Sequence, residues 1–99
     1  MTPERRGRPG PRVLIVDDHL LFAEVIRTAL EAEELDVIAT AHTARRGFEL
    51  ACAERPDVVL VDMGLPDASG LALGAQILEE VPGSNVVALT AWRDERMAR

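Results

Sequence analysis

Three aspartates stand where hydrophobic runs of this chain end. Asp17 and Asp18 follow the run 13–16, and Asp62 follows the run 58–61. Continuous aliphatic runs are typical of buried parallel strands, whose carboxyl ends meet at the edge of the sheet where ligands bind. Carboxylates gathered there repel one another unless they share a proton or a cation lies among them. Because carboxylate oxygens favour hard cations, the pattern predicts a Mg²⁺ site.

Two further segments could add groups to this edge. After the third aspartate, Pro66 and Gly70 are expected to shape the turn that leads to the next helix. A later hydrophobic run, 86–89, is followed by Thr90 and Ala91, which offer a hydroxyl and a backbone N–H beside a small side chain. A carboxylate, a hydroxyl and an amide near a cation are the groups that phosphoryl transfer requires.

The elements that must position these groups follow from the hydrophobic pattern. Runs at 13–16, 58–61 and 86–89 predict strands buried on both faces, and 36–41 predicts a weaker strand. Helical periodicity separates them, so the order is strand then helix four times, with the fourth helix incomplete. Right-handed crossovers in such a series give a doubly wound parallel sheet.

Capping residues and apolar faces define the helices between these strands. Thr43 and Ser69 are predicted to cap the second and third helices, and Pro82 and Gly83 to end the third, which covers about 70–81. A predicted apolar face has one residue every three or four positions. Its members are Phe22, Val25, Ile26, Ala29 and Leu30 in the first helix, and Ala44, Phe48, Ala51, Cys52 and Arg55 in the second.

Composition restricts the class of protein. The chain has 99 residues and a net charge of −6, which allow one domain and argue against direct binding to DNA. Its single cysteine excludes an internal disulfide, and neither a long apolar run nor a signal-peptide pattern occurs. A cytoplasmic protein without a membrane segment is expected. Residues 1–11, rich in Arg, Pro and Gly, are expected to be a disordered leader; a phosphate-binding basic arm is the alternative.

These motifs together resemble the receiver domain of bacterial two-component response regulators, from about Arg12 to Arg99. The acid pair, the lone strand-end aspartate, the Leu-Pro-x-x-Ser-Gly loop at 65–70 and the Thr-Ala pair agree with that family in order and spacing. The Asp-Asp-His triplet at 17–19 is similar to the subgroup attached to LuxR-type helix-turn-helix output domains. The resemblance implies a flavodoxin-like (CheY-like) α/β fold.

By this resemblance, Asp62 is the phosphoacceptor, which takes a phosphoryl group from a histidine kinase and so regulates a transcriptional output. The family's ligand pattern places Mg²⁺ on Asp17, Asp18, Asp62 and the main-chain carbonyl of Gly64. Thr90 would be the switch hydroxyl, assisted by the backbone amide of the next residue, Ala91. The resemblance implies a phosphorelay module and not a turnover enzyme.

The chain departs from the family pattern at its end. Family members continue through a fifth strand and helix and carry a Lys after that strand, whereas this chain contains no Lys. Residues 12–99 are therefore expected to be a truncated receiver domain with four strands in the order 2-1-3-4. The fourth strand, 85–90, would be an exposed apolar edge, so the isolated chain is expected to dimerise, aggregate or be partly unfolded.

Other interpretations remain open at this point. Asp17 and Asp18 could cap the helix that follows them. His19 could be read as a general base or a metal ligand, but a polar residue facing the loop is favoured, because the hard ions expected at this site prefer oxygen ligands. Asp67 is expected to be solvated. The chain could dock on a kinase without being phosphorylated, act as a decoy, or be a fragment without a role of its own. Haloacid-dehalogenase-like phosphatases also use a strand-end aspartate, but they carry a general acid two residues later, where this chain has Gly64.

Overall fold

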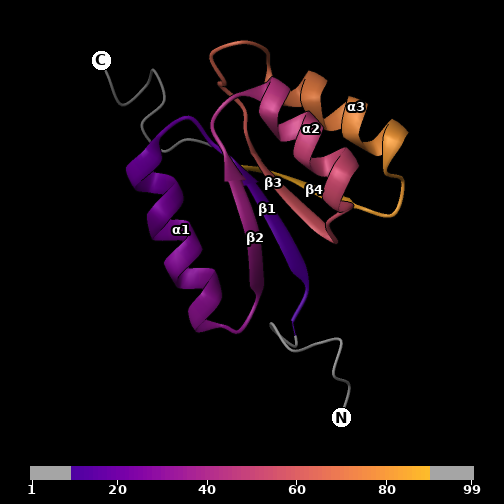
Figure 1. Cartoon of the computed structure of the whole chain (residues 1–99). Coiled ribbons are helices and arrows are strands. Elements are labelled where there is room, and N and C mark those ends of the chain that lie inside the picture. Colours follow the sequence, from indigo (N-terminus) through magenta and orange to yellow (C-terminus); the bar gives the residue numbers. More distant parts are fainter. Residues whose placement is uncertain (1–9, 90–99) are drawn as a thin grey trace.

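The structure is a computed structural model that describes residues 10–89, in which four strands alternate with three helices (Figure 1). Thr90, Ala91 and residues 1–9 of the leader predicted at 1–11 lie outside the described residues. In chain order the elements are β1 (Arg12–Val16), α1 (Leu20–Ala32), β2 (Asp36–Ala41), α2 (Ala44–Glu54), β3 (Val58–Asp62), α3 (Gly70–Glu80) and β4 (Asn85–Leu89).

The strands form one parallel sheet in the order β2-β1-β3-β4. Helix α1 covers one face, and α2 and α3 cover the other (Figure 1). This arrangement is the flavodoxin-like (CheY-like) doubly wound sheet, and the predicted strand order is confirmed. Val16 at the end of β1 pairs with both Ala41 and Val61, so the carboxyl ends of the three strands are level.

Alternating side chains of the strands divide the core between the two faces. Leu14 and Val16 of β1 pack with α2 and α3, whereas Val13 and Ile15 pack with α1. Both helical layers depend on this central strand, whose residues 13–16 are almost fully buried. A Cβ on Gly47 of α2 would lie 2.8 Å from Val16 Cγ2, so glycine there lets α2 lie close to β1.

The predicted caps of α2 and α3 are confirmed. Thr43 Oγ1 accepts a hydrogen bond from the Arg46 amide at 3.1 Å, and Ser69 Oγ accepts one from the Ala72 amide at 3.0 Å. Each bond satisfies an amide that the first helical turn leaves without a backbone partner. Helix α3 ends at Glu80, one residue before its predicted end.

The apolar faces predicted for the first two helices are partly wrong. In α1, Ala23 is buried and Ile26 and Leu30 pack against the sheet, while Phe22, Val25 and Ala29 are exposed. The small side chain of Ala23 brings the helix against β1 and β2 along a narrow stripe, so the flanking positions stay outside. In α2, Arg55 is not part of the face; it is the C-cap, with a left-handed φ of 49°.

Strand β4 is not buried on both faces, contrary to the prediction from its hydrophobic run, but it is the exposed apolar edge expected from comparison with the family pattern. Within residues 10–89 it lies at the edge of the sheet and pairs only with β3. Val86 packs against the core beneath α3, but Val87 on the opposite face is 45% exposed. An apolar run can therefore belong to an edge strand as well as to a central one.

Among the described residues, no helix has both the length and the apolar character needed to cross a membrane.

Adjacent residues of α3 provide a test of the described core. Ile77 is fully buried beneath the helix and Leu78 is 46% exposed. Ile77→Ala is expected to lower the free energy of unfolding by about 2–5 kcal/mol, because it leaves a cavity in the core. Leu78→Ala, the matched control, is expected to cost less than about 1 kcal/mol. Urea unfolding followed by circular dichroism measures both, and equal losses would contradict the orientation of α3.

Candidate functional site

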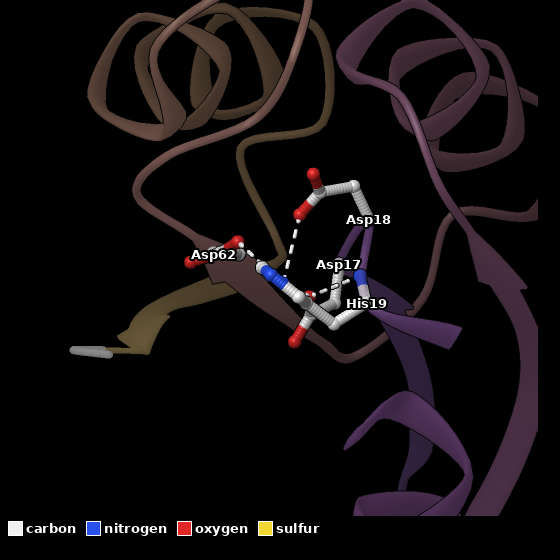
Figure 2. Close-up of side chains that lie close together, drawn as sticks. All are labelled: Asp17, Asp18, His19 and Asp62. Atoms are coloured by element: carbon white, nitrogen blue, oxygen red, sulfur yellow. Dashed lines mark hydrogen bonds and ion pairs between the residues drawn. The ribbon is translucent and has the colours of Figure 1, made fainter. Parts of the chain in front are cut away.

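Three aspartates converge at the carboxyl ends of β1 and β3. Asp17 and Asp18 directly follow β1, and Asp62 is the last residue of β3 (Figure 2). The Asp17 amide extends the ladder to β2 by donating to the Ala41 carbonyl at 2.9 Å. Strand order reverses at β1, so the cluster occupies the position where doubly wound sheets bind ligands. The convergence expected from the sequence is present.

His19 also belongs to this cluster. Its Nδ1 lies 3.1 Å from Asp18 Oδ1, 3.3 Å from Asp17 Oδ1 and 4.0 Å from Asp62 Oδ2 (Figure 2). One potential ligand atom from each of the four side chains lies within 4.8 Å of the others. His19 therefore joins the cluster, although the sequence favoured a loop-facing polar residue there, and its side chain remains 44% exposed.

The start of α1 explains why the imidazole enters the cluster. His19 is the N-cap residue, and its side chain makes no capping hydrogen bond. The His19 amide donates instead to Asp17 Oδ1 at 2.9 Å, which orients the backbone at the end of β1. Neither Asp17 nor Asp18 occupies the N-cap position, so the helix-capping alternative is wrong for both aspartates.

The carboxyl group of Asp62 is enclosed and incompletely hydrogen-bonded. The residue is 3% exposed, and its Oδ1 accepts a long hydrogen bond from the Gly64 amide at 3.4 Å. Within residues 10–89, no donor forms a hydrogen bond with Oδ2. Burial raises the pKa of Asp62 above its ordinary value; the Gly64 amide opposes this rise, and the charge of Asp17 adds to it.

A close backbone contact holds the loop after Asp62. The Gly70 amide donates to the Met63 carbonyl at 3.0 Å, and a Cβ on Gly70 would overlap the carbonyl oxygen of Asp62. Gly64 forms an isolated bridge with Ser69 across the same loop. The predicted role of Gly70 in shaping this loop is therefore confirmed: because it has no Cβ, α3 can begin against the backbone of Asp62.

Asp67, expected only to be solvated, connects this loop to α2. It is exposed, yet its two carboxylate oxygens accept hydrogen bonds from the amides of Ala44 at 2.7 Å and Arg45 at 3.1 Å. The hydrogen bond from the Ala44 amide is the main cause that lowers the pKa of Asp67, followed by the one from the Arg45 amide. An aspartate beside a helix N-terminus also interacts favourably with the helix dipole. No local sequence signal reveals this pairing, because its partners lie 22 and 23 residues away.

His42 supports the other side of the cluster. Its Nδ1 lies 2.9 Å from the main-chain oxygen of Asp17, where it donates a hydrogen bond in the tautomer that carries a proton on that nitrogen. The sequence offered no site role for His42. Its position directly after β2 could only become meaningful once β2 was known to lie beside β1.

Strand register brings one further predicted segment to the site. Leu89, the last residue of β4, is the Cα partner of Asp62. The predicted switch hydroxyl of Thr90 and the amide of Ala91 follow directly in sequence and lie outside the described residues. The Gly64 carbonyl likewise remains a predicted ligand.

Comparison with known proteins matches this arrangement to a family. The model for the response regulator receiver domain matches residues 13–99. The chain belongs to the response regulator receiver domain family. A solved LuxR-family response regulator from an Aurantimonas species superposes with a TM-score of 0.79 at 26% identity, covering 90% of this chain and 64% of that one.

Curated relatives show the contexts in which such receiver domains occur. The transcriptional regulatory protein LnrK of Bacillus subtilis is 34% identical over 87 residues, which are 87% of this chain and 40% of LnrK. A protein-glutamate methylesterase/protein-glutamine glutaminase of Anaeromyxobacter dehalogenans is 40% identical over 81 residues, which are 81% of this chain and 24% of that protein. The chain thus spans less than half of either relative.

Removing the charge of Asp62 is expected to stabilise this receiver domain. A raised native pKa means that ionisation of Asp62 opposes folding at neutral pH, and that this cost disappears below its unfolded pKa of about 3.9. In buffer with a metal chelator at pH 7, Asp62→Asn is expected to raise the melting temperature; relief of about 1 kcal/mol corresponds to about 4–8 °C.

The gain is expected to shrink as the pH falls through the raised pKa towards 4. Asp36→Asn, at the opposite edge of the sheet, is the control for removing one negative charge. Equal stabilisation by both substitutions would point to net charge and not to the cluster.

Proposed function

We propose that this chain is the phosphoacceptor module of a two-component phosphorelay and that Asp62 accepts the phosphoryl group. The observation that carries the proposal is the buried Asp62 carboxyl, with one oxygen lacking a hydrogen bond within residues 10–89, beside two other aspartates. A carboxylate needed only for stability would be fully hydrogen-bonded or exposed. The Asp62 carboxyl is neither, which supports its assignment as a ligand-binding group.

The donor set fits a divalent cation. Three carboxylates supply hard oxygen ligands, and the unsatisfied Asp62 Oδ2 faces the other members of the cluster. Asp17, Asp18, Asp62 and the Gly64 carbonyl would hold Mg²⁺. When bound, the cation offsets negative charge on the three aspartates and on the transferring group.

The acceptor's own chemistry is a nucleophilic displacement at phosphorus. A carboxylate oxygen of Asp62 forms the new O–P bond while the N–P bond of a kinase phosphohistidine breaks, and the departing imidazole nitrogen takes up the electron pair. The Gly64 amide and the contact with Gly70 keep Asp62 oriented during transfer. In this proposal the Thr90 hydroxyl donates a hydrogen bond to the acyl phosphate, and the backbone amide of Ala91 assists.

Partner and output follow from the same proposal. The partner is a sensor histidine kinase, and the output is transcriptional, as in the relative named a transcriptional regulatory protein. Residues 12–99 form the receiver unit and 1–11 a leader. In this proposal the chain does not itself bind DNA, because its net charge is −6. It is also not a turnover enzyme, because Asp62 is itself modified by the phosphoryl group.

Phosphorylation by a small donor tests the acceptor directly. In Mg²⁺ and phosphoramidate, the chain is expected to gain the mass of one phosphoryl group and to lose it on treatment with hydroxylamine, which cleaves acyl phosphates. Asp62→Asn is expected to abolish the gain, and Asp36→Asn to retain it. Unmodified wild-type chain that still binds a kinase would favour the docking alternative, whereas modification of Asp62→Asn would place the acceptor elsewhere.

The exposed β4 edge supports a second element of the proposal, self-association. Val87 lies in the middle of this apolar strand, which pairs on one side only within the described residues. Sedimentation equilibrium is expected to show dimers or larger species, and Val87→Lys to shift the chain at least severalfold towards monomer, because edge lysines oppose strand pairing. Leu21→Lys on α1, 80% exposed, is the control; if it alone has this effect, the interface lies on α1.

A further inference from the structure

We propose that His19 is a ligand of the bound cation, so that the site prefers first-row transition-metal ions over Mg²⁺ more strongly than carboxylates alone would dictate. This inference rests on the proposed metal site and adds a nitrogen donor to it. The class of ion is Mn²⁺, Co²⁺ or Ni²⁺. Imidazole suits such borderline ions, while Mg²⁺ favours oxygen ligands.

Donor spacing around His19 fits a single ion. Ligands about 2.1 Å from an octahedral cation lie about 3 Å apart when adjacent and about 4.2 Å apart when opposite. Nδ1 of His19 lies 3.1 Å from Asp18 Oδ1 and 3.3 Å from Asp17 Oδ1, as adjacent ligands would. Its separation from Asp62 Oδ2, 4.0 Å, is close to the spacing of opposite ligands.

An independent observation marks the position as a ligand site. Asp62 is only 3% exposed, yet its Oδ2 forms no hydrogen bond with any group of residues 10–89. Figure 2 shows the imidazole of His19 directed between this oxygen and the carboxylate of Asp18. A single ion between the donors would bind both the buried Asp62 Oδ2 and Nδ1 of His19.

The backbone holds His19 for this role. Its amide is fixed by Asp17 Oδ1 at 2.9 Å, and its side chain takes no part in capping α1. The ring reaches the cluster from the N-cap position of α1, where its contacts with the carboxylates of Asp17 and Asp18 already place Nδ1 among the other donors. A ligand positioned in advance binds an ion at lower entropic cost.

Pulsed electron paramagnetic resonance of bound Mn²⁺ tests the inference on the full chain. A directly ligated imidazole produces nitrogen coupling in the spin-echo modulation, and selective ¹⁵N labelling of histidine identifies it. Wild type is expected to show this coupling, and His19→Gln to lose it. His42→Gln tests the other of the chain's two histidines, which contacts the main chain of Asp17 from outside the cluster. Whatever the affinity of this variant, the Mn²⁺ that it binds is expected to keep the coupling.

Metal affinities give a second readout. His19→Gln is expected to weaken Co²⁺ or Ni²⁺ binding about tenfold or more while changing Mg²⁺ binding less than about threefold. Circular dichroism of the variant checks that it folds. Bound Mn²⁺ without histidine coupling, or equal weakening for all ions, would overturn the role of His19 and leave the phosphoacceptor proposal intact. Absence of any metal binding would overturn the proposed metal site and with it the role of His19, whereas the phosphoramidate experiment separately decides whether Asp62 accepts a phosphoryl group.

Discussion

Repulsion among Asp17, Asp18 and Asp62 is the constraint around which the rest of this structure is arranged. Parallel pairing of β1 and β3 brings these carboxyl groups together at the reversal in strand order, and burial of Asp62 strengthens their mutual effect. The fold stabilises the cluster only in part, through backbone amides and the imidazole of His19. What remains unsatisfied is an oxygen that faces the other carboxylates, and this makes the edge suited to a cation and to phosphoryl transfer.

Contacts from distant segments keep this unfavourable arrangement in place. His42, after β2, contacts the main chain of Asp17, and Asp67 connects the loop after Asp62 to the start of α2. Gly70 allows α3 to begin against the backbone of Asp62. These three contacts approach the cluster from different elements, so Asp17 and Asp62 are held from the end of β2 and from the starts of α2 and α3. Charge strain at a site is sustained when the surrounding structure is well determined.

The two faces of the sheet are unequally covered within residues 10–89. Helices α2 and α3 cover a continuous core, whereas α1 covers mainly β1 and β2 on the opposite face (Figure 1). Exposed apolar side chains remain on α1 and β4, among them Leu21, Val25 and Val87. The site lies at the well-packed centre of the sheet and the exposed apolar surface at its periphery. Association at the periphery could therefore change without moving the aspartates.

Local patterns were sufficient to predict much of the fold and the acidic site. Hydrophobic runs gave the strands to within one residue, because burial of a central strand requires consecutive aliphatic side chains. Thr43 and Ser69 identified two helix starts, since a cap bonds an amide three residues away. The aspartates converged as expected because parallel strands align their carboxyl ends.

Long-range packing decided what these patterns left open. The exposed side of α1 depends on which strands the helix covers, and the exposure of β4 depends on its place in the sheet. The hydrophobic periodicity of the sequence gives neither. Asp67 acquired its role from amides more than 20 residues away, and His19 from an aspartate on another strand. The sequence by itself therefore determined which elements form and where the acids stand. Only the tertiary structure decided which side chains complete the site, because those contacts exist only after the strands have paired.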